Sequence, residues 1–94
     1  MDKKFLNKVV DQIIGETKID YDKEEIYFPF DPDLFTFYYI MTGVIVEDLV
    51  IDKFFHHCKN VYGLNEEEIL YVWEEYSRII KDKIFVEYGF TNQY

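Results

Sequence analysis

Residues 65–84 read NEEEILYVWEEYSRIIKDKI, and this segment decides the fold class of the chain. Its apolar residues recur every three or four positions, the spacing that places side chains on one face of an α-helix. The stripe comprises Ile69, Val72, Trp73, Tyr76, Ile80 and Ile84. Asn65 and Glu68 resemble a capping box at the helix start. Glu74 precedes Arg78 by four residues, a spacing that favours a surface ion pair.

Two more helices are predicted on the N-terminal side of this one. A helix that begins near Glu47 and stops at Gly63 has its own stripe. That stripe comprises Ile51, Phe54, Phe55, Cys58 and Tyr62. The first segment predicts an amphipathic helix that is capped by Asp2 and ends near Gly15. Its apolar positions are Phe5, Leu6, Val9, Val10, Ile13 and Ile14.

The segment between these helices has a different character. Residues 16–33 are rich in carboxylates and contain Pro29 and Pro32, which interrupt helices, so we expect an ordered acidic connector. Residues 26–30 within it are apolar enough to lie as a short extended edge against the core. Residues 34–42 fit a short buried helix or a strand, and the Thr42-Gly43 stop favours the helix.

These elements predict a single domain over residues 1–94. The fold class expected is mainly α, a small bundle of three to four helices with an ordered acidic connector. The alternative is an α+β fold with a short sheet from residues 26–30, 35–41 and 84–90. The aromatic tail after residue 84 is expected to pack as an extended arm if it is not a strand.

Composition and charge limit the classes of partner. Nineteen Asp and Glu stand against ten Lys and Arg, a net charge of -9, which opposes binding to nucleic acid and to anionic lipid. The longest uncharged run, residues 34–46, is shorter than the roughly 20 residues of a membrane span. Cys58 is the only cysteine and no signal peptide is recognised, so a cytoplasmic protein is expected. The absence of alanine and the excess of Lys over Arg indicate an AT-rich gene, viral or from a low-GC bacterium.

Two patterns suggest metal sites, and neither meets the requirements of one. His56, His57 and Cys58 are adjacent, and neighbouring helical residues point about 100° apart, so they do not converge on one ion. Asp20, Asp22, Glu24 and Asp31 take positions 1, 3, 5 and 12 of a calcium-binding loop. Glu25 stands where that loop needs glycine, and Pro29 lies inside it. We therefore expect no metal and no cofactor.

Catalysis and DNA binding receive little support from the residues. The chain has no recognisable catalytic triad and no Gly-rich phosphate loop, so no catalytic residue is predicted. A helix-turn-helix would use residues 66–83 as its recognition helix, but five glutamates in that segment would face phosphates. No direct contact with nucleic acid is expected.

The leading functional hypothesis is a regulatory or scaffolding module that binds another protein or a second copy of itself. Nineteen aromatic side chains exceed what one small core hides, and several lie beside carboxylates that suit a basic partner. The predicted contact residues are Tyr21, Tyr27, Phe28, Phe30, Asp31, Asp33, Tyr38 and Tyr39.

Two alternatives remain open. An acidic inhibitor would mimic nucleic acid and block a basic groove on its target, and its affinity would fall steeply with salt. A small enzyme would combine His57 or Cys58 with carboxylates of another subunit at an oligomer interface.

Overall fold

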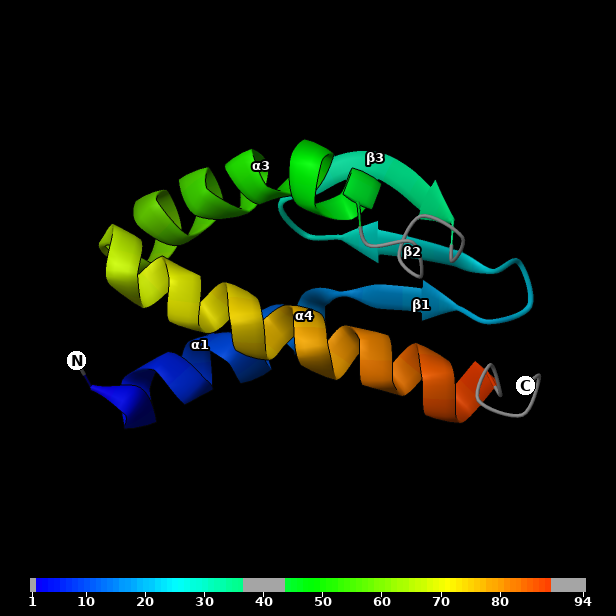
Figure 1. Cartoon of the computed structure of the whole chain (residues 1–94), viewed down its shortest axis with the longest axis horizontal. Coiled ribbons are helices and arrows are strands. Elements are labelled where there is room, and N and C mark those ends of the chain that lie inside the picture. The colour runs from blue at the N-terminus through cyan, green and yellow to red at the C-terminus, as the bar shows by residue number, and fades with distance from the viewer. Residues whose placement is uncertain (1, 37–43, 89–94) are drawn as a thin grey trace.

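Helices and a small antiparallel sheet make up the described part of the chain (Figure 1). The structure is a computed structural model that describes residues 2–36 and 44–88, with side chains for residues 2–30 and 50–86. The elements are α1 (Lys3–Glu16), β1 (Lys18–Asp20), β2 (Glu25–Phe28), β3 (Asp31–Thr36), α3 (Val44–Tyr62) and α4 (Glu66–Tyr88). The strands pair in the order β1-β2-β3, so β1 and β3 form the edges of the sheet.

The expectation of a mainly helical fold is confirmed, and the sheet agrees in part with the α+β alternative. Its strands cover residues 18–20, 25–28 and 31–36. The second and third overlap the predicted segments 26–30 and 35–41, whereas β1 was not predicted and residues 84–88 are helical. Residues 34–36 are strand, which contradicts the short helix predicted over 34–42, and residues 37–43 lie outside the described part. Residues 84–88 continue α4, so they form neither a strand nor an extended arm.

The acidic connector predicted over residues 16–33 is not observed, because β1, β2 and the start of β3 occupy most of it. Apolar residues explain the difference. Ile19 pairs with Ile26 across the two strands, and Ile26 and Phe28 are both buried. Their spacing of two is the strand period, which directs both side chains to one face and the intervening residue to the other. Tyr27, the residue between them, points to the other face, so the inner face of β2 is apolar.

The N-terminus of α1 is fixed by the predicted cap. The Asp2 side chain accepts a hydrogen bond from the Phe5 N–H at 3.2 Å. The buried stripe of α1 faces the core as expected and comprises Leu6, Val9, Val10 and Ile13. Phe5, by contrast, is 44% exposed. At the other end the Thr17 hydroxyl donates to the Ile13 carbonyl at 2.8 Å. The helix therefore starts and stops on side-chain hydrogen bonds.

The turn between α3 and α4 combines two caps. Gly63 has φ 66, a left-handed conformation that glycine adopts without strain, and its N–H bonds the Lys59 carbonyl at 3.2 Å. The predicted capping box then opens α4. The Glu68 N–H donates to Asn65 Oδ1 at 2.9 Å, and the Asn65 N–H donates to Glu68 Oε1 at 3.0 Å. Both caps set the angle at which α4 returns along α3.

The substitution Asn65→Ala is expected to lower the free energy of unfolding by about 1 kcal/mol, because the Glu68 N–H loses its acceptor. Asn65→Asp retains an oxygen at the same position and should stay within a few tenths of a kcal/mol of the native protein. Chemical denaturation of the three proteins measures the difference. Equal midpoints for Asn65→Ala and the native chain would contradict this role of the cap.

The core lies between the three helices and the sheet, and aromatic rings fill its centre. The fully buried side chains include Leu6, Ile13, Ile26, Val50, Phe54, Ile69, Val72, Tyr76 and Ile84. The Phe54 ring centroid lies 4.9 Å from that of Trp73 and 5.1 Å from that of Phe30, both in edge-to-face contact. Such geometry adds to the free energy gained by burying the rings. Phe54 therefore joins α4 to the sheet.

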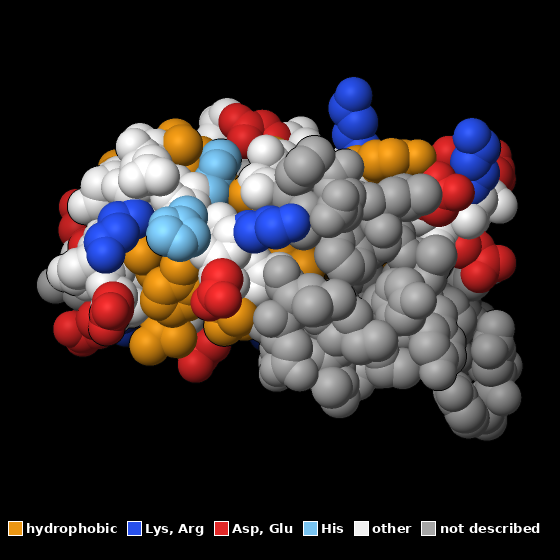
Figure 2. Space-filling model, turned by 90° about the horizontal axis from the view of Figure 1, so that it is seen from above, with side chains coloured by type: hydrophobic (Ala, Val, Ile, Leu, Met, Phe, Trp, Pro, Cys, Tyr) orange, Lys and Arg blue, Asp and Glu red, His pale blue; other side chains and the backbone are white. Residues whose placement is uncertain are grey.

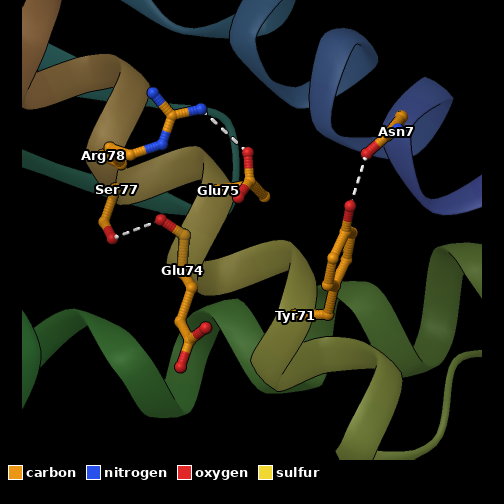
Figure 3. Close-up of polar contacts among 6 residues, drawn as sticks. All are labelled: Asn7, Tyr71, Glu74, Glu75, Ser77 and Arg78. Carbon is orange, nitrogen blue, oxygen red and sulfur yellow. Dashed lines mark hydrogen bonds and ion pairs between the residues drawn. The ribbon is translucent and has the colours of Figure 1, made fainter. Parts of the chain in front are cut away.

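Helices α1 and α4 lie side by side and are linked by two polar contacts (Figure 1). The Tyr71 hydroxyl points from α4 towards α1 and donates to Asn7 Oδ1 at 2.9 Å (Figure 3). The Tyr76 hydroxyl lies 2.7 Å from the Thr17 hydroxyl at the end of α1. These contacts join residues that are 64 and 59 positions apart in the sequence.

The ion pair predicted on the surface of α4 uses a different carboxylate. Arg78 Nη2 donates to Glu75 Oε2 at 2.9 Å, three residues back, whereas Glu74 was expected (Figure 3). Residues three apart and residues four apart are both neighbours on a helix surface, so the sequence alone does not show which glutamate pairs with Arg78. Both partners are largely exposed, and such a pair adds little stability.

Candidate interaction surface

A hairpin made of β1 and β2 carries the candidate site. Asp20 Oδ1 accepts a hydrogen bond from the Lys23 N–H at 3.1 Å, and Glu24 adopts φ 57, so residues 21–24 turn without a glycine. The register places Ile19 opposite Ile26, which is fully buried. Since strand neighbours point to opposite faces, the residues on either side of this pair face outward. The hairpin thus has an apolar inner face and a polar outer face.

We call the outward residues Lys18, Asp20, Glu25 and Tyr27 the hairpin face. Lys18 lies opposite Tyr27, and Asp20 lies opposite Glu25. The second pair sets two carboxylates directly against each other, and like charges in that position destabilise a sheet. Tyr27 is 41% exposed. The hairpin face therefore combines an exposed ring with a local excess of negative charge.

The Tyr27 hydroxyl belongs to the same network. It donates to Glu25 Oε2 at 2.7 Å. This hydrogen bond raises the pKa of Tyr27, and the negative charges of Glu25 and Asp20 raise it further. The phenol stays protonated at neutral pH and offers one ring face and a fixed hydroxyl to a partner.

An open groove runs along β1 beside the hairpin face. Its volume is about 510 Å³, and its lining residues are Lys18, Ile19, Asp20, Tyr21, Asp22 and Tyr27. Because β1 is an edge strand, its outer backbone groups pair with no other strand within residues 2–36 and 44–88. An edge of this kind is a template for another extended chain. The groove therefore lies along the unpaired edge of β1.

The eight predicted contact residues fall in several places. Tyr27 lies on the hairpin face, and Tyr21 is half-buried in the turn that lines the groove. Phe28 is 6% exposed and stacks on Phe30 at 5.1 Å within the core, so neither belongs to the hairpin face. The other four predicted residues fall where no side chain is described. Asp31 and Asp33 have only their backbone placed, in β3, and Tyr38 and Tyr39 lie outside the described residues.

Sequence reasoning did not include five residues of the groove and hairpin face among the contact residues: Lys18, Ile19, Asp20, Asp22 and Glu25. The signal was the alternation of polar and apolar residues over 25–28, which gives a strand its two faces. The pairing of Lys18 and Asp20 with that strand depends on the turn at residues 21–24. Because no glycine marks this turn, the pairing could not be predicted from the sequence.

A second groove lies between α1 and the C-terminal end of α3. It has a volume of about 410 Å³ and is lined by Phe5, Lys8, Val9, Gln12, Glu16, Val61 and Tyr62. Phe5 and Val61 are 44% and 60% exposed, which makes this groove the more apolar of the two. It contains one lysine and one glutamate and no like-charged pair.

The three reactive side chains of α3 differ in burial. Cys58 is 0% exposed, and its burial raises the pKa of the thiol to about 12. His57 is half-buried, its ring centroid lies 6.0 Å from Phe30 and 5.9 Å from Tyr62, and its buried Nε2 has no hydrogen-bond partner within the described part of the chain. His56 is exposed, as the stripe predicts. Neither Cys58 nor His57 lines either groove described above.

Charged side chains of both signs are interspersed on the face seen in Figure 2, where both histidines reach the surface. Among the described residues, no group of three or more His, Cys, Asp or Glu has the geometry to hold a metal ion. Asp20 uses its carboxylate to close the hairpin turn instead of facing a calcium loop. Three glutamates in the first turn of α4 match the helix dipole.

No helix within the described ranges has the length and apolar character needed to cross a bilayer. Comparison of the chain with family models, with curated proteins and with solved structures finds no match. Function is therefore inferred from the hairpin face and the edge of β1.

Proposed function

We propose that this chain is a non-catalytic protein–protein interaction module that binds an extended segment along the edge of β1, with a lysine or arginine of that segment opposite Asp20. The observation that carries the proposal is the pair of opposed carboxylates, Asp20 and Glu25, beside an open strand edge and the exposed Tyr27. Within the isolated chain this arrangement costs free energy, because like charges lie directly opposite each other. A cation supplied by a partner reverses that cost.

A partner would supply this cation by adding a strand to the sheet at the edge of β1. A strand that pairs with β1 places one of its residues opposite Asp20, and main-chain hydrogen bonds hold it there. A lysine or arginine at that position lies beside both Asp20 and Glu25. Tyr27, opposite Lys18, adds an exposed ring to the same face. The main-chain hydrogen bonds thus contribute affinity, and the side chains of the hairpin face determine which partner sequences bind.

The placement of the reactive groups supports a binding role over catalysis. A nucleophile needs access to substrate and a lowered pKa, whereas Cys58 is buried and its pKa is raised. His57 packs against aromatic rings and lines neither groove. An acidic inhibitor of a nucleic-acid-binding protein would need many spaced carboxylates, and salt dependence separates it from the module proposed here.

A fluorescent peptide of β-branched residues with one central lysine is expected to bind the full chain, measured by anisotropy. The double variant Asp20→Asn, Glu25→Gln should weaken binding by roughly tenfold, because two cross-strand charge pairs are lost. Both substitutions keep the acceptor oxygens that bond the Lys23 N–H and the Tyr27 hydroxyl, so the hairpin is expected to fold.

The matched control is Asp11→Asn, Glu74→Gln, which removes the same charge from exposed sites on α1 and α4. It should bind as the native chain does. Raising the salt concentration is expected to weaken binding only several-fold, because about two ion pairs are involved. Equal affinities for the two double variants, or no binding by the native chain, would remove the basis of this proposal. A steep loss with salt would favour the acidic inhibitor.

A further inference from the structure

We infer that the segment that pairs with β1 is β1 of a second copy, so that the chain forms an antiparallel dimer through this edge. The inference rests on the function proposed above and names its partner. It follows from the sequence of β1 itself, which reads Lys18, Ile19, Asp20. The charges on the two sides of Ile19 are opposite in sign.

An antiparallel pairing centred on Ile19 is therefore self-complementary. The two-fold axis passes between the two Ile19 residues, and Lys18 of each copy lies opposite Asp20 of the other. Each lysine then approaches the carboxylates of Asp20 and Glu25, which oppose each other within one hairpin. Two identical ion-pair sites form, and the like-charge contact in each hairpin gains a cation.

Other registers lack this match. A parallel pairing in register places Lys18 beside Lys18 and Asp20 beside Asp20, which repel. A shift of the antiparallel pairing by one residue places Ile19 of one copy opposite Lys18 or Asp20 of the other, so the apolar and polar faces of the two hairpins no longer coincide. A lysine on an edge strand usually discourages pairing with neutral strands, and here it accepts only a strand that presents a carboxylate.

The surroundings of β1 leave room for the second copy. Lys18 is exposed, Ile19 and Asp20 are half-exposed, and the groove of about 510 Å³ runs along the same residues. Pairing joins two sheets of order β1-β2-β3 into one six-stranded sheet with Tyr27 of both copies on the outer face. A contact of three residues per strand buries little area, so the dimer is weak and reversible.

Sedimentation equilibrium of the full chain tests the inference. The native protein is expected to dimerise with a dissociation constant of about 10–100 μM, in the range of small, transient interfaces. Lys18→Glu converts both ion pairs into like-charge pairs and should weaken the dimer roughly tenfold or more. Lys4→Glu changes the net charge equally at an exposed site on α1 and should leave dimerisation unchanged.

A mixing experiment tests the register. Asp20→Lys alone should also weaken the dimer roughly tenfold or more. When the Lys18→Glu and Asp20→Lys variants are mixed, each altered residue meets an opposite charge, so a mixed dimer at least as strong as the native one is expected. Circular dichroism confirms that both variants fold, which is needed because Asp20→Lys removes the hydrogen bond to the Lys23 N–H. Amide protection of residues 18–20 that rises with protein concentration gives an independent readout of the native dimer.

The outcomes separate this inference from the proposed function. A native chain that stays monomeric, or a Lys18→Glu variant that dimerises like Lys4→Glu, overturns the dimer. If a monomeric native chain still binds the basic peptide, the interaction module stands with a different partner. If it binds neither itself nor the peptide, both proposals fail.

Discussion

Replacing Phe54 with alanine is expected to lower the free energy of unfolding by about 3–5 kcal/mol, the range for buried Phe-to-Ala substitutions. Phe54 is fully buried, and its ring contacts Phe30, Trp73 and Tyr76 with centroid distances of 5.1, 4.9 and 5.5 Å. Removing the ring leaves a cavity bordered by rings from both α4 and the loop before β3. Those rings cannot collapse together, because each is held by its own element.

Urea denaturation followed by Trp73 fluorescence measures this loss. Phe54→Leu keeps most of the side-chain volume and should lower the free energy of unfolding by about 1 kcal/mol. This variant provides a measurement if Phe54→Ala does not fold. Phe5→Ala is the matched control, since Phe5 is 44% exposed and contributes less burial. A loss for Phe54→Ala no larger than that for Phe5→Ala would show that the aromatic cluster does not support the fold.

Cys58 is expected to react with iodoacetamide about 1000-fold more slowly in the folded chain than in the denatured chain at about pH 8. Burial raises the pKa of the thiol from 9.0 to about 12, and the thiolate is the reacting form. Mass spectrometry after timed labelling measures the rate, and the assay reads one site because Cys58 is the single cysteine. Similar rates in the folded and denatured chain would contradict the burial of Cys58.

The same raised pKa makes stability depend on pH. Above pH 9.0 the unfolded chain loses the Cys58 proton while the folded chain keeps it, so stability falls as pH rises from 9.0 to about 12. Cys58→Val removes this group and should flatten the decline. Part of the slope should remain, because burial also raises the pKa of Tyr76. An unchanged slope in Cys58→Val would rule out a contribution from the thiol.

Prediction from sequence succeeded where a long apolar stripe and a cap occur together. Helix α4 shows this best, because the six residues of its stripe are all buried and Asn65 forms the predicted box with Glu68. In α3 the burial of Cys58 was predicted from the same periodicity. Burial of such a stripe requires only local spacing, and local spacing can be read from the sequence.

The sheet could not be predicted in the same way. Its strands have three, four and six residues, too short for a periodic signal to stand out. The turn that joins β1 to β2 places Glu24 at φ 57 where Gly or Asn is usual, so the common hairpin signal is missing. Pro32 lies within β3, an edge strand, where proline is tolerated. The pairing of Asp20 with Glu25, which defines the hairpin face, depends on this turn.

The packing of α1 against α4 has a consequence for synthesis on the ribosome. Asn7 and Thr17 bond to Tyr71 and Tyr76, which are translated 64 and 59 residues later. At about 5–20 residues per second, α1 waits roughly 3–13 s for these contacts. During that interval the stripe of Leu6, Val9, Val10 and Ile13 has no α4 to cover it. The nascent chain therefore leaves these apolar side chains without their α4 partner until α4 emerges.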